Sequence, residues 1–427
     1  MAIVIQKFGG SSLADSSCII RCAERAAAAR RDGHRVVVVV SAMGETTDDL
    51  IALAAQVTDQ PSQRELDMLL TTGEQVSIAL MTMALHRGGM AAVSMTGAQI
   101  GIITDEFHTR ARIRSIDTEA LQAELDDGRI IVVAGFQGMS SEGQLTTLGR
   151  GGSDTTALAI AAALGVGGEA GAGMCEIYTD VDGVYTADPR IVPNARKLDR
   201  ISAEEMLELA SLGAGVLHSR AVVFGQKYNV PIHVRHSGKP DRGTMIIRET
   251  PDMEDVTVVG CALTPDLGRI SVRGIPNSPG MQGNLFKRIA GTDAVVDDII
   301  QTESGETANI SFMVDHRDLA EVKVAVEKAL HDAGAGEMAI EIGLAKVSAV
   351  GVGMRTHAGV AATMFAALGD AGVHIANITT SEIKISCIVP KEQGEKALRA
   401  VHDAFGLDRA HQQRPRRPDA ALRRPVT

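Results

Sequence analysis

The chain has 427 residues, with 45% hydrophobic and 22% charged side chains and a net charge of -11 at pH 7. This length allows two or three folded domains, and the composition is typical of a globular protein. An acidic chain argues against a nucleic-acid-binding protein, because such proteins normally carry a basic face.

The cysteines and the N-terminal residues favour an intracellular protein. Cys18 and Cys22 lie one helical turn apart, but no neighbouring His or Cys completes a metal-binding set. We interpret the five cysteines as buried apolar side chains in a reducing compartment. The first residues lack the features of a signal peptide, and no segment approaches the ~20 apolar residues of a membrane span. We therefore expect a cytoplasmic protein with no metal ligand set, no nucleic-acid partner and no membrane contact.

Residues 1–250 alternate between strand and helix patterns. Apolar runs of strand length occur at residues 3–6, 36–40, 91–94, 130–134, 176–179 and 232–234. Helical patterns lie between them at residues 19–30, 66–86, 117–126 and 154–164. This alternation predicts an α/β fold with a mainly parallel sheet. Ligands of such sheets bind beyond the C-terminal ends of the strands, so the loops at that end are the candidates for chemistry.

The first of these loops favours phosphate binding. The first strand ends at Lys7, which is followed by Gly9, Gly10 and Ser11. Glycines let backbone N–H groups approach phosphate oxygens, hydroxyls donate hydrogen bonds, and lysine supplies positive charge. The chain contains no Walker A loop and no protein-kinase signature. An ordinary Gly-Gly-Ser turn is the alternative at this point.

Two further segments are expected at the same end of the sheet. Residues 41–47 follow the second strand and open a helix, and they offer the hydroxyls of Ser41 and Thr47. Gly73 lies inside a helical pattern, where glycine costs about 1 kcal/mol, and this indicates close approach by another segment. Its neighbour Glu74 could receive an ammonium group. An exposed glutamate beside a packing glycine is an equally good interpretation.

The segment 146–156 runs directly into an apolar helix. Ser153 or Asp154 is expected to cap this helix, and a free helix N-terminus behind two glycines attracts anions. Arg150 adds a planar guanidinium that can pair with a carboxylate through two hydrogen bonds. Asp154 beside an anion would be unfavourable unless a cation such as Lys7 or Mg²⁺ offsets its charge. A capped helix with a salt-bridged arginine is the alternative.

Residues 178–190 leave a strand into a loop with Asp-Gly and Asp-Pro turn signals. Two of the three tyrosines, Tyr178 and Tyr185, lie in this segment. A tyrosine ring can stack on adenine while Arg190 reaches phosphates, so we predict a nucleotide-binding loop here.

The chain repeats itself from about residue 265. Residues 270–276 match residues 347–353, and residues 310–314 match residues 385–389. Each copy is predicted to be a β-loop-α-β-β-α unit of about 70 residues, so this part is a duplication of a small α+β module. The tail from residue 409 to residue 427 is rich in Pro and Arg and is expected to be disordered, with weak contact to an acidic surface as the alternative.

The chain resembles the bacterial aspartate kinases of the amino-acid kinase superfamily in the motifs KFGGSS, SAMGETTDDL, TTGEQ, TTLGRGGSDTTA and EIYTDVDGVYTADPR. Its repeated part resembles that family's paired ACT domains in GIPNSPG, MRTHAGV and TTSEIKIS. The resemblance covers residues 1 to about 408. It implies an α/β fold: a three-layer α/β/α amino-acid kinase (carbamate kinase-like) catalytic domain over residues 1–250. It further implies two ferredoxin-like α+β ACT domains, over residues 265–338 and 345–408.

The resemblance implies transfer of the γ-phosphoryl group of ATP to the β-carboxylate of L-aspartate, giving 4-phospho-L-aspartate and ADP. This would be the first step of lysine, diaminopimelate, threonine and methionine biosynthesis. The attacking carboxylate has a reference pKa of about 3.9 and is ionised at pH 7, so no general base is needed. Catalysis then reduces to alignment and charge neutralisation, with Mg²⁺ on the ATP phosphates and no prosthetic group.

By similarity, Lys7 neutralises charge on the transferring phosphoryl group, and Asp154 holds Lys7 and the substrate in place. The residues implied for aspartate are Ser41, Thr47, Glu74 (for its ammonium group), and Arg150, Gly152 and Ser153 (for a carboxylate). Those implied for the nucleotide are Gly9, Gly10, Ser11, Thr179, Asp180, Asp182, Gly183, Tyr185 and Arg190. Those implied for effectors are Asn277, Gly280, Gln301, Ile375 and Ser381. Lysine and threonine are the expected inhibitors, and pairing of ACT domains implies a homo-oligomer.

Three departures from the family pattern stand out. Gly215 occupies a position where the family usually has a lysine that touches nucleotide phosphates, which predicts weaker ATP binding. His374 lies where the second ACT copy usually has Asn, which leaves the identity of the effector open. Residues 165–174 form a long Gly-rich link that should enter its strand at the end away from the ligands.

Two other functions fit parts of the sequence. The chain could be a non-catalytic amino-acid sensor on a kinase scaffold, but Lys7, Arg150, Asp154 and Arg190 are all retained. It could also be a sibling acyl kinase that acts on glutamate, acetylglutamate or carbamate.

Overall fold

The computed structural model describes residues 2–167, 173–213, 215–248, 257–292, 294–355 and 357–409. Its N-terminal part is built on an eight-stranded sheet. The strands are β1 (Ile3–Phe8), β2 (Arg35–Val40), β3 (Ala92–Met95), β6 (Ile130–Ala134), β9 (Gly173–Thr179), β10 (Arg200–Ser202), β11 (Ile232–His236) and β12 (Thr244–Ile247). The helices are α1 (Ser16–Arg31), α2 (Thr46–Val57), α3 (Gln63–Arg87), α4 (Glu119–Asp126), α5 (Gly152–Ala163), α6 (Ala203–Ser211) and α7 (Ser219–Tyr228).

The strand order of this sheet is β10-β12-β11-β9-β1-β2-β6-β3. Neighbouring strands are parallel except for the pair β11 and β12. All six strands expected from the sequence are present, and the mainly parallel sheet is confirmed. The C-terminal ends of β1, β2 and β9 therefore lie at one edge, as the loop argument required.

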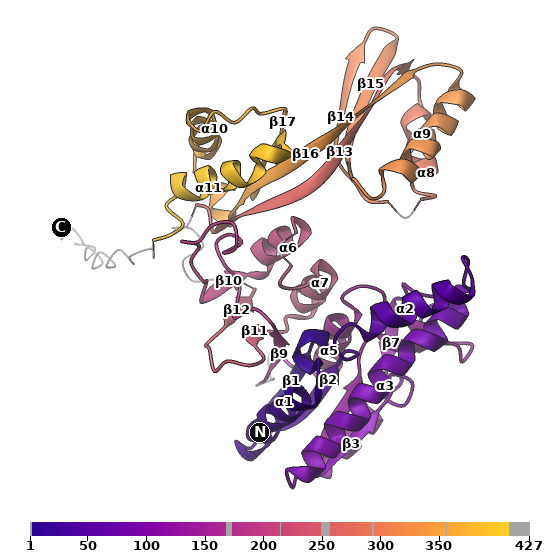
Figure 1. Ribbon diagram of the computed structural model, residues 1–427, viewed down its shortest axis with the longest axis vertical. Helices are drawn as coiled ribbons and strands as arrows, with labels where there is room; N and C mark the ends of the chain where they lie inside the picture. Colours follow the sequence, from indigo (N-terminus) through magenta and orange to yellow (C-terminus); the bar gives the residue numbers. More distant parts are fainter. Residues whose placement is uncertain are drawn as a thin grey trace, which may run out of the picture.

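Helices cover both faces of this sheet, so the three-layer α/β/α architecture is confirmed (Figure 1). Val37 and Val39 of β2 share a core with helices α4 to α7. Val36, Val38 and Val40 share a second core with α1 and α3. Successive side chains of a strand point to opposite faces, so an unbroken run of valines is what a strand buried on both sides needs.

A smaller four-stranded sheet extends the N-terminal part, and the sequence patterns did not predict it. Its strands are β4 (Ile102–Thr104), β5 (Ile113–Ile116), β7 (Gln137–Ser140) and β8 (Leu145–Thr147), in the order β5-β4-β7-β8. These strands are too short to show a clear period of two. The sheet matters because β8 leads directly into the Arg150 loop.

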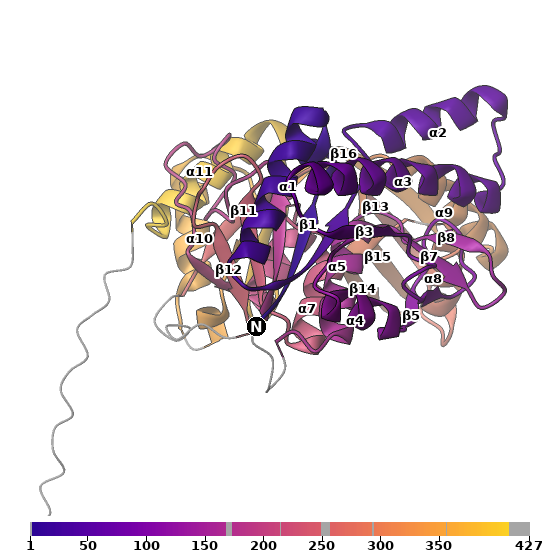
Figure 2. The same ribbon diagram turned by 90° about the horizontal axis from the view of Figure 1, so that it is seen from below.

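Helix α3 is the core helix of this part. Among the described residues, it alone is long and apolar enough to cross a membrane by length and composition, and half of that stretch is buried in the protein. The expectation that no segment comes near this limit is therefore corrected. Its buried face carries Asp67 and Glu74, and α2 lies outside it with no buried residue of its own (Figure 2).

The C-terminal part is a six-stranded sheet with helices on it (Figure 1). The elements are β13 (Gly260–Pro276), α8 (Met281–Ile289), β14 (Val296–Ser304), β15 (Thr307–Asp315), α9 (Leu319–Ala333), β16 (Glu337–Val350), α10 (Val360–Asp370), β17 (Asn377–Thr380), β18 (Lys384–Pro390) and α11 (Gly394–Ala404). The strand order is β14-β15-β13-β16-β18-β17. Both copies show the predicted strand, helix, two strands and helix.

The first residues of β13 complete the second copy. Residues 260–264 pair with residues 346–350 of β16, whereas residues 269–273 pair with residues 337–341. Helix α11 of the second copy also packs on β13. The domain limits of 265–338 and 345–408 stay predictions, and the strand pairing adds residues 260–264 to the sheet of the second copy. The predicted tail lies outside the described residues apart from Arg409.

Candidate functional site

The two residues expected to carry catalysis form an ion pair. Lys7 Nζ at the end of β1 lies 2.5 Å from Asp154 Oδ1 in the first turn of α5. The side chains are only 11% and 12% exposed, so water screens this pair weakly. The cation that Asp154 was expected to need is therefore Lys7. A lysine held in this way presents its remaining N–H donors at the C-terminal edge of the sheet.

The glycine loop after β1 packs against the loop after β2. A Cβ atom on Gly10 would lie 2.8 Å from the carbonyl oxygen of Gly44 and 3.1 Å from that of Ala42. The Gly44 N–H donates to the Gly10 carbonyl at 3.0 Å, and the Ser41 N–H donates to the Phe8 carbonyl at 3.1 Å. Glycine at position 10 is thus required by a close approach of two backbones.

Glu74 lies beneath the same loops. The residue is 2% exposed. Oε1 accepts from the Ala42 N–H at 3.0 Å, and Oε2 has no partner among the described residues. Burial raises the pKa of Glu74 to about 7, although the Ala42 N–H stabilises the charged form. A Cβ atom on Gly73 would lie 2.8 Å from the Ala42 Cβ, so the close approach predicted from this mid-helix glycine is confirmed. Thr47 lies half-buried in the first turn of α2.

The expected cap of α5 is wrong. Gly151 is the N-cap, with φ of 69°, and Ser153 and Asp154 lie in the first turn instead. Gly151 is needed because a Cβ atom there would lie 2.4 Å from the His218 side chain, in addition to the left-handed backbone. No side chain caps α5. The Gly152 N–H donates to the Gly149 carbonyl at 2.9 Å, so the N–H groups that follow it in the first turn, those of Ser153 and Asp154, are the candidates for binding an anion.

Arg150 precedes this N-cap and is exposed. Ser153 is 7% exposed. Together with the N-terminus of α5, a guanidinium and a hydroxyl at this place can bind a carboxylate.

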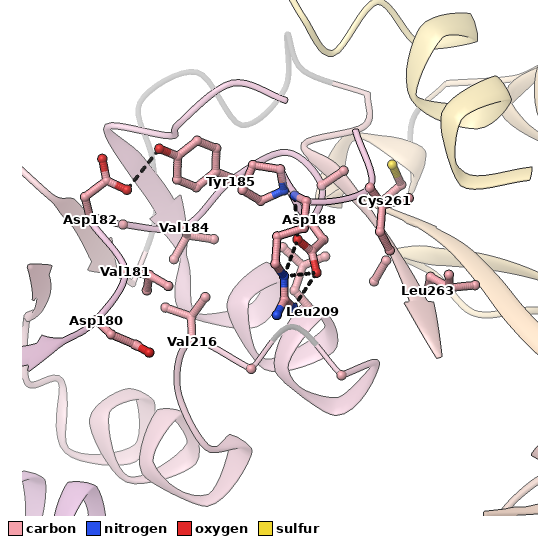
Figure 3. A pocket seen from close by; sticks show the side chains of 18 residues that line it. Asp180, Val181, Asp182, Val184, Tyr185, Asp188, Leu209, Val216, Cys261 and Leu263 are labelled. Atoms are coloured by element: carbon pink, nitrogen blue, oxygen red, sulfur yellow. Dashed lines mark hydrogen bonds and ion pairs between the residues drawn. The ribbon is translucent and has the colours of Figure 1, made fainter. Parts of the chain in front are cut away.

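A cavity of about 470 Å³ adjoins the 178–190 loop (Figure 3). It is lined by five of the residues implied for the nucleotide, namely Asp180, Asp182, Gly183, Tyr185 and Arg190. The opposite wall comes from α6, from the link that contains Gly215, and from Cys261, Ala262 and Leu263 of β13. The first strand of the repeated part therefore contributes one wall of the candidate nucleotide pocket. Thr179, at the end of β9, donates to Asp180 Oδ1 at 2.9 Å.

The charged groups of this cavity are largely paired with one another. The Arg190 guanidinium donates to both oxygens of Asp188, with distances of 2.7 to 3.1 Å, and holds the pKa of that carboxyl below its ordinary value. Tyr185 Oη donates to Asp182 Oδ1 at 2.9 Å, and Lys197 lies 3.5 Å from the same carboxylate. Arg190 therefore has to leave Asp188, or share its donors, to reach a phosphate.

Tyr178 does not serve as an adenine platform. The residue is 2% exposed, and its ring stacks on Phe8 with centroids 4.8 Å apart and lies under the guanidinium of Arg25. Its hydroxyl donates to Glu176 at 3.1 Å. Even-numbered residues of β9 face α1, so Tyr178 is a core residue, and Tyr185 is the tyrosine that borders the cavity.

A second, smaller cavity of about 210 Å³ adjoins Ser11, Cys18 and Asp180. It lies on the α1 side of the same sheet edge.

The effector residues lie in two groups. Gly280 is the N-cap of α8, Asn277 follows β13, and Gln301 of β14 accepts from Gln282 at 3.2 Å. Ile375 and Ser381 flank β17, at the opposite end of the strand order. His374 lies beside Gln393, whose side chain accepts from its N–H at 3.0 Å.

Sequence reasoning missed residues whose neighbours are distant in the chain. Residues 261–263 of β13 line the cavity, but no local sequence pattern marks them, because their role depends only on contact with the distant 178–190 loop. His218, which packs on Gly151, follows the Gly215 link and could have been noticed there. Asp67 lies two helical turns before Glu74, and this spacing places both carboxylates on one face of α3.

Known proteins match the chain over nearly its full length. A model of the amino acid kinase family matches residues 2–236, and an ACT domain model matches residues 347–405. An aspartate kinase of Pseudomonas putida is 48% identical over 410 residues, which is 96% of this chain and 98% of the relative. Aspartokinase 2 of Bacillus subtilis is 48% identical over 96% of this chain and 99% of the relative.

Solved structures show the same relationship. Aspartate kinase from Synechocystis aligns with a TM-score of 0.53 and 40% identity, over 95% of this chain and 70% of that protein. E. coli aspartokinase III in complex with aspartate and ADP has a TM-score of 0.76 at 24% identity, over 94% of this chain and 99% of that protein, and shows a common fold. The same E. coli enzyme in complex with lysine and aspartate, described as the T-state, has a TM-score of 0.72 at 25% identity, over 94% of this chain and 99% of that protein.

Proposed function

The chain belongs to the aspartate kinases of the amino acid kinase family, and from this premise we propose how its own residues perform and regulate the reaction. It is an ATP-dependent phosphotransferase. The proposal covers the residue roles, the divalent cation, the pathway, the feedback control, the oligomer and the location in the cell.

The β-carboxylate of aspartate attacks the γ-phosphorus of ATP. A new O–P bond forms, the bond to the bridging oxygen breaks, and ADP leaves with the electron pair. Lys7 offsets the negative charge that spreads over the transferring phosphoryl oxygens, and Asp154 keeps Lys7 aligned through the ion pair at 2.5 Å. The carboxylate is already ionised at neutral pH, so alignment and charge are the main contributions of the protein.

Aspartate is held at its two charged ends. The ammonium group pairs with Glu74, and the α-carboxylate pairs with Arg150 and the N-terminus of α5 at Gly152 and Ser153. Ser41 and Thr47 complete the pocket. The observation that carries this proposal is the buried Glu74 Oε2, which has no partner among the described residues. A buried carboxylate oxygen is costly without a donor, and an ammonium group supplies one.

The nucleotide occupies the cavity lined by Asp180, Asp182, Gly183, Tyr185 and Arg190, with its phosphates towards Gly9, Gly10 and Ser11. Mg²⁺ would come bound to the ATP phosphates. Within the described residues no group of three or more His, Cys, Asp or Glu side chains is placed to hold a metal ion. Mg²⁺ is usually bound through substrate phosphates and water together with one or two carboxylates.

The product, an acyl phosphate of aspartate, would feed lysine, threonine and methionine biosynthesis in the cytoplasm. Lysine, threonine or both would inhibit through the residues around Asn277 and Gly280 and those around Ile375 and Ser381. The support for lysine is the lysine complex of E. coli aspartokinase III. Inhibition requires that the effector bind an inactive state more tightly than the active state. ACT domains of two subunits would pair to form a homo-oligomer.

A coupled assay of ADP release tests this function. The chain with Mg²⁺-ATP and aspartate should turn over, glutamate in place of aspartate should not support turnover, and lysine with threonine should lower the rate. An absence of turnover with aspartate would favour a non-catalytic amino-acid sensor. Turnover with glutamate would favour a sibling acyl kinase.

A further inference from the structure

Asp67 is a fully buried carboxylate that the proposed reaction does not use. It is 0% exposed, and both of its carboxylate oxygens accept hydrogen bonds. Oδ1 accepts from Thr147 Oγ1 at 2.5 Å and from the Thr109 N–H at 3.0 Å, and Oδ2 accepts from His108 Nδ1 at 2.7 Å. A buried charge survives in a folded protein only with such a set of donors. Because a carboxylate accepts from it, Nδ1 of His108 carries the hydrogen.

These donors come from two segments that meet next to the Arg150 loop. Thr147 is the last residue of β8 and lies three positions before Arg150. Thr109 has φ of 64°, a left-handed backbone that is unfavourable for a β-branched residue. Its N–H is held by both oxygens of Asp67, at 3.0 and 3.1 Å. These hydrogen bonds to Asp67 therefore stabilise the strained turn at Thr109.

The strained turn at Thr109 also contacts residues 147–149, which lead to Arg150. The Thr109 carbonyl oxygen would lie 3.1 Å from a Cβ atom on Gly149, and the Ala111 N–H donates to the Thr147 carbonyl at 2.8 Å. From the other side, Arg220 of α7 donates to the carbonyl oxygens of Leu148 at 2.7 Å and Ala111 at 2.9 Å. Residues 147–149 are thus clamped between Asp67 and Arg220, and Arg150 is the next residue.

We propose that Asp67 is a positioning residue for aspartate binding. Through its hydrogen bonds to Thr147 and Thr109, it fixes the short loop that leads from the end of β8 to Arg150 and so sets the position of the guanidinium. This inference rests on the proposed role of Arg150 in binding the substrate carboxylate. Asp67 and Glu74 lie on one face of α3, so a single rigid helix fixes both ends of the substrate. Glu74 would contact the ammonium group directly, and Asp67 would act through the loop that carries Arg150.

The test separates aspartate binding from ATP binding. Asp67→Asn keeps the size of the side chain but turns an NH₂ group toward one of the three donors. We expect the KM for aspartate to rise about tenfold or more, with the KM for ATP changed less than about twofold. Thr147→Val removes one donor at constant size and should act in the same direction. It provides the comparison if Asp67→Asn does not fold.

Glu205→Gln is the matched control, because Glu205 is also a buried, hydrogen-bonded carboxylate but lies on α6. It should lower the melting temperature without raising the KM for aspartate. The inference is overturned if Asp67→Asn and Thr147→Val lower the melting temperature but leave the KM for aspartate unchanged.

Arg150→Ala, assayed in parallel, distinguishes this failure from failure of the proposed site. If Arg150→Ala raises the KM for aspartate and the Asp67 and Thr147 variants do not, only the positioning role is wrong. If Arg150→Ala itself leaves the KM for aspartate unchanged, the assignment of the carboxylate site is wrong.

Discussion

At the scale of single residues, Glu74 shows how burial creates a binding group. The carboxyl group has one satisfied oxygen and one without a partner among the described residues, and its pKa is raised to about 7 by burial. The folded state therefore binds a proton more readily than the unfolded chain between pH 4.5 and about 7. The stabilising contribution of this group is present below pH 4.5 and is lost as pH rises through about 7. An ammonium group bound at Glu74 would favour the ionised carboxylate and so oppose the effect of burial on its pKa.

The same titration should govern aspartate capture. Only ionised Glu74 attracts an ammonium group, so kcat/KM for aspartate should fall by about tenfold per pH unit below pH 7. Glu74→Gln should lower kcat/KM for aspartate at pH 8 and remove this dependence on pH. The measurement is kcat/KM for aspartate from about pH 6 to 8 at saturating ATP. A flat profile for the unmodified chain would contradict the assignment of Glu74.

Gly215 leaves the nucleotide pocket without a free cation at this position. It lines the cavity, a Cβ atom on it would meet nothing within 4 Å, and Arg190 is bound to Asp188. Gly215→Lys should lower the KM for ATP about tenfold, because one charge-assisted hydrogen bond contributes about 1.5–3 kcal/mol. Gly369→Lys, at an equally open glycine in α10, is the control and should leave it unchanged. An ordinary KM for ATP that Gly215→Lys does not improve would refute this prediction.

At the scale of elements, helix α6 joins the catalytic part to the second ACT repeat. Glu205 Oε1 accepts from the Val352 N–H at 3.1 Å, Lys384 pairs with Glu208 at 3.0 Å, and Arg355 pairs with Glu204. The three acidic residues can make these contacts only if the first turns of α6 are formed. The other wall of the nucleotide cavity includes Leu209 of the same helix.

The N-terminus of α6 is held by a capping box, which makes its stability testable. Ser202 Oγ accepts from the Glu205 N–H at 3.2 Å, and Glu205 Oε2 accepts from the Ser202 N–H at 3.2 Å. Ser202→Ala should lower the free energy of unfolding by about 1 kcal/mol, and Ser202→Thr should lower it less. Ser211→Ala, at the exposed end of the same helix, serves as the control in denaturant titrations. Equal stability of Ser202→Ala and the unmodified chain would show that the cap contributes nothing.

At the scale of the whole molecule, the kinase part and the second ACT repeat share a core. Ala187 and Val192 from the nucleotide loop pack with residues of the second ACT repeat. The Cys261 N–H donates to the Thr186 carbonyl at 2.8 Å, and His402 Nε2 lies 3.0 Å from Thr186 Oγ1. Movement of the second repeat would therefore displace the nucleotide loop directly.

This junction should be sensitive to acid. Burial lowers the pKa of His402, so the folded state keeps this imidazole neutral at a pH where the unfolded chain has already bound a proton. Its contribution to stability is present above its ordinary pKa of 6.5 and is lost as pH falls below that value. His402→Gln should weaken the loss of unfolding free energy between about pH 7 and 5. His331→Gln, on the exposed end of α9, should not; an unchanged slope in His402→Gln would contradict the prediction.

The sequence alone determined six strands of the larger sheet, helices α1, α3, α4 and α5, and which loops share one edge of that sheet. Those conclusions depend on local properties: valine runs buried on both faces, glycines after strands, and a repeat that has to fold twice in the same way. The sequence also indicated that Asp154 needs a nearby cation, either Lys7 or Mg²⁺, and the structure places Lys7 there.

Only the tertiary structure decided what each loop touches. It buried Tyr178 under α1, made Gly151 rather than Ser153 the cap of α5, and placed residues 260–264 in the second ACT repeat and against the nucleotide cavity. It also gathered Thr109 and Thr147 around Asp67. Each of these contacts joins residues that are far apart in the chain, and packing over such distances leaves no periodic or local pattern in the sequence.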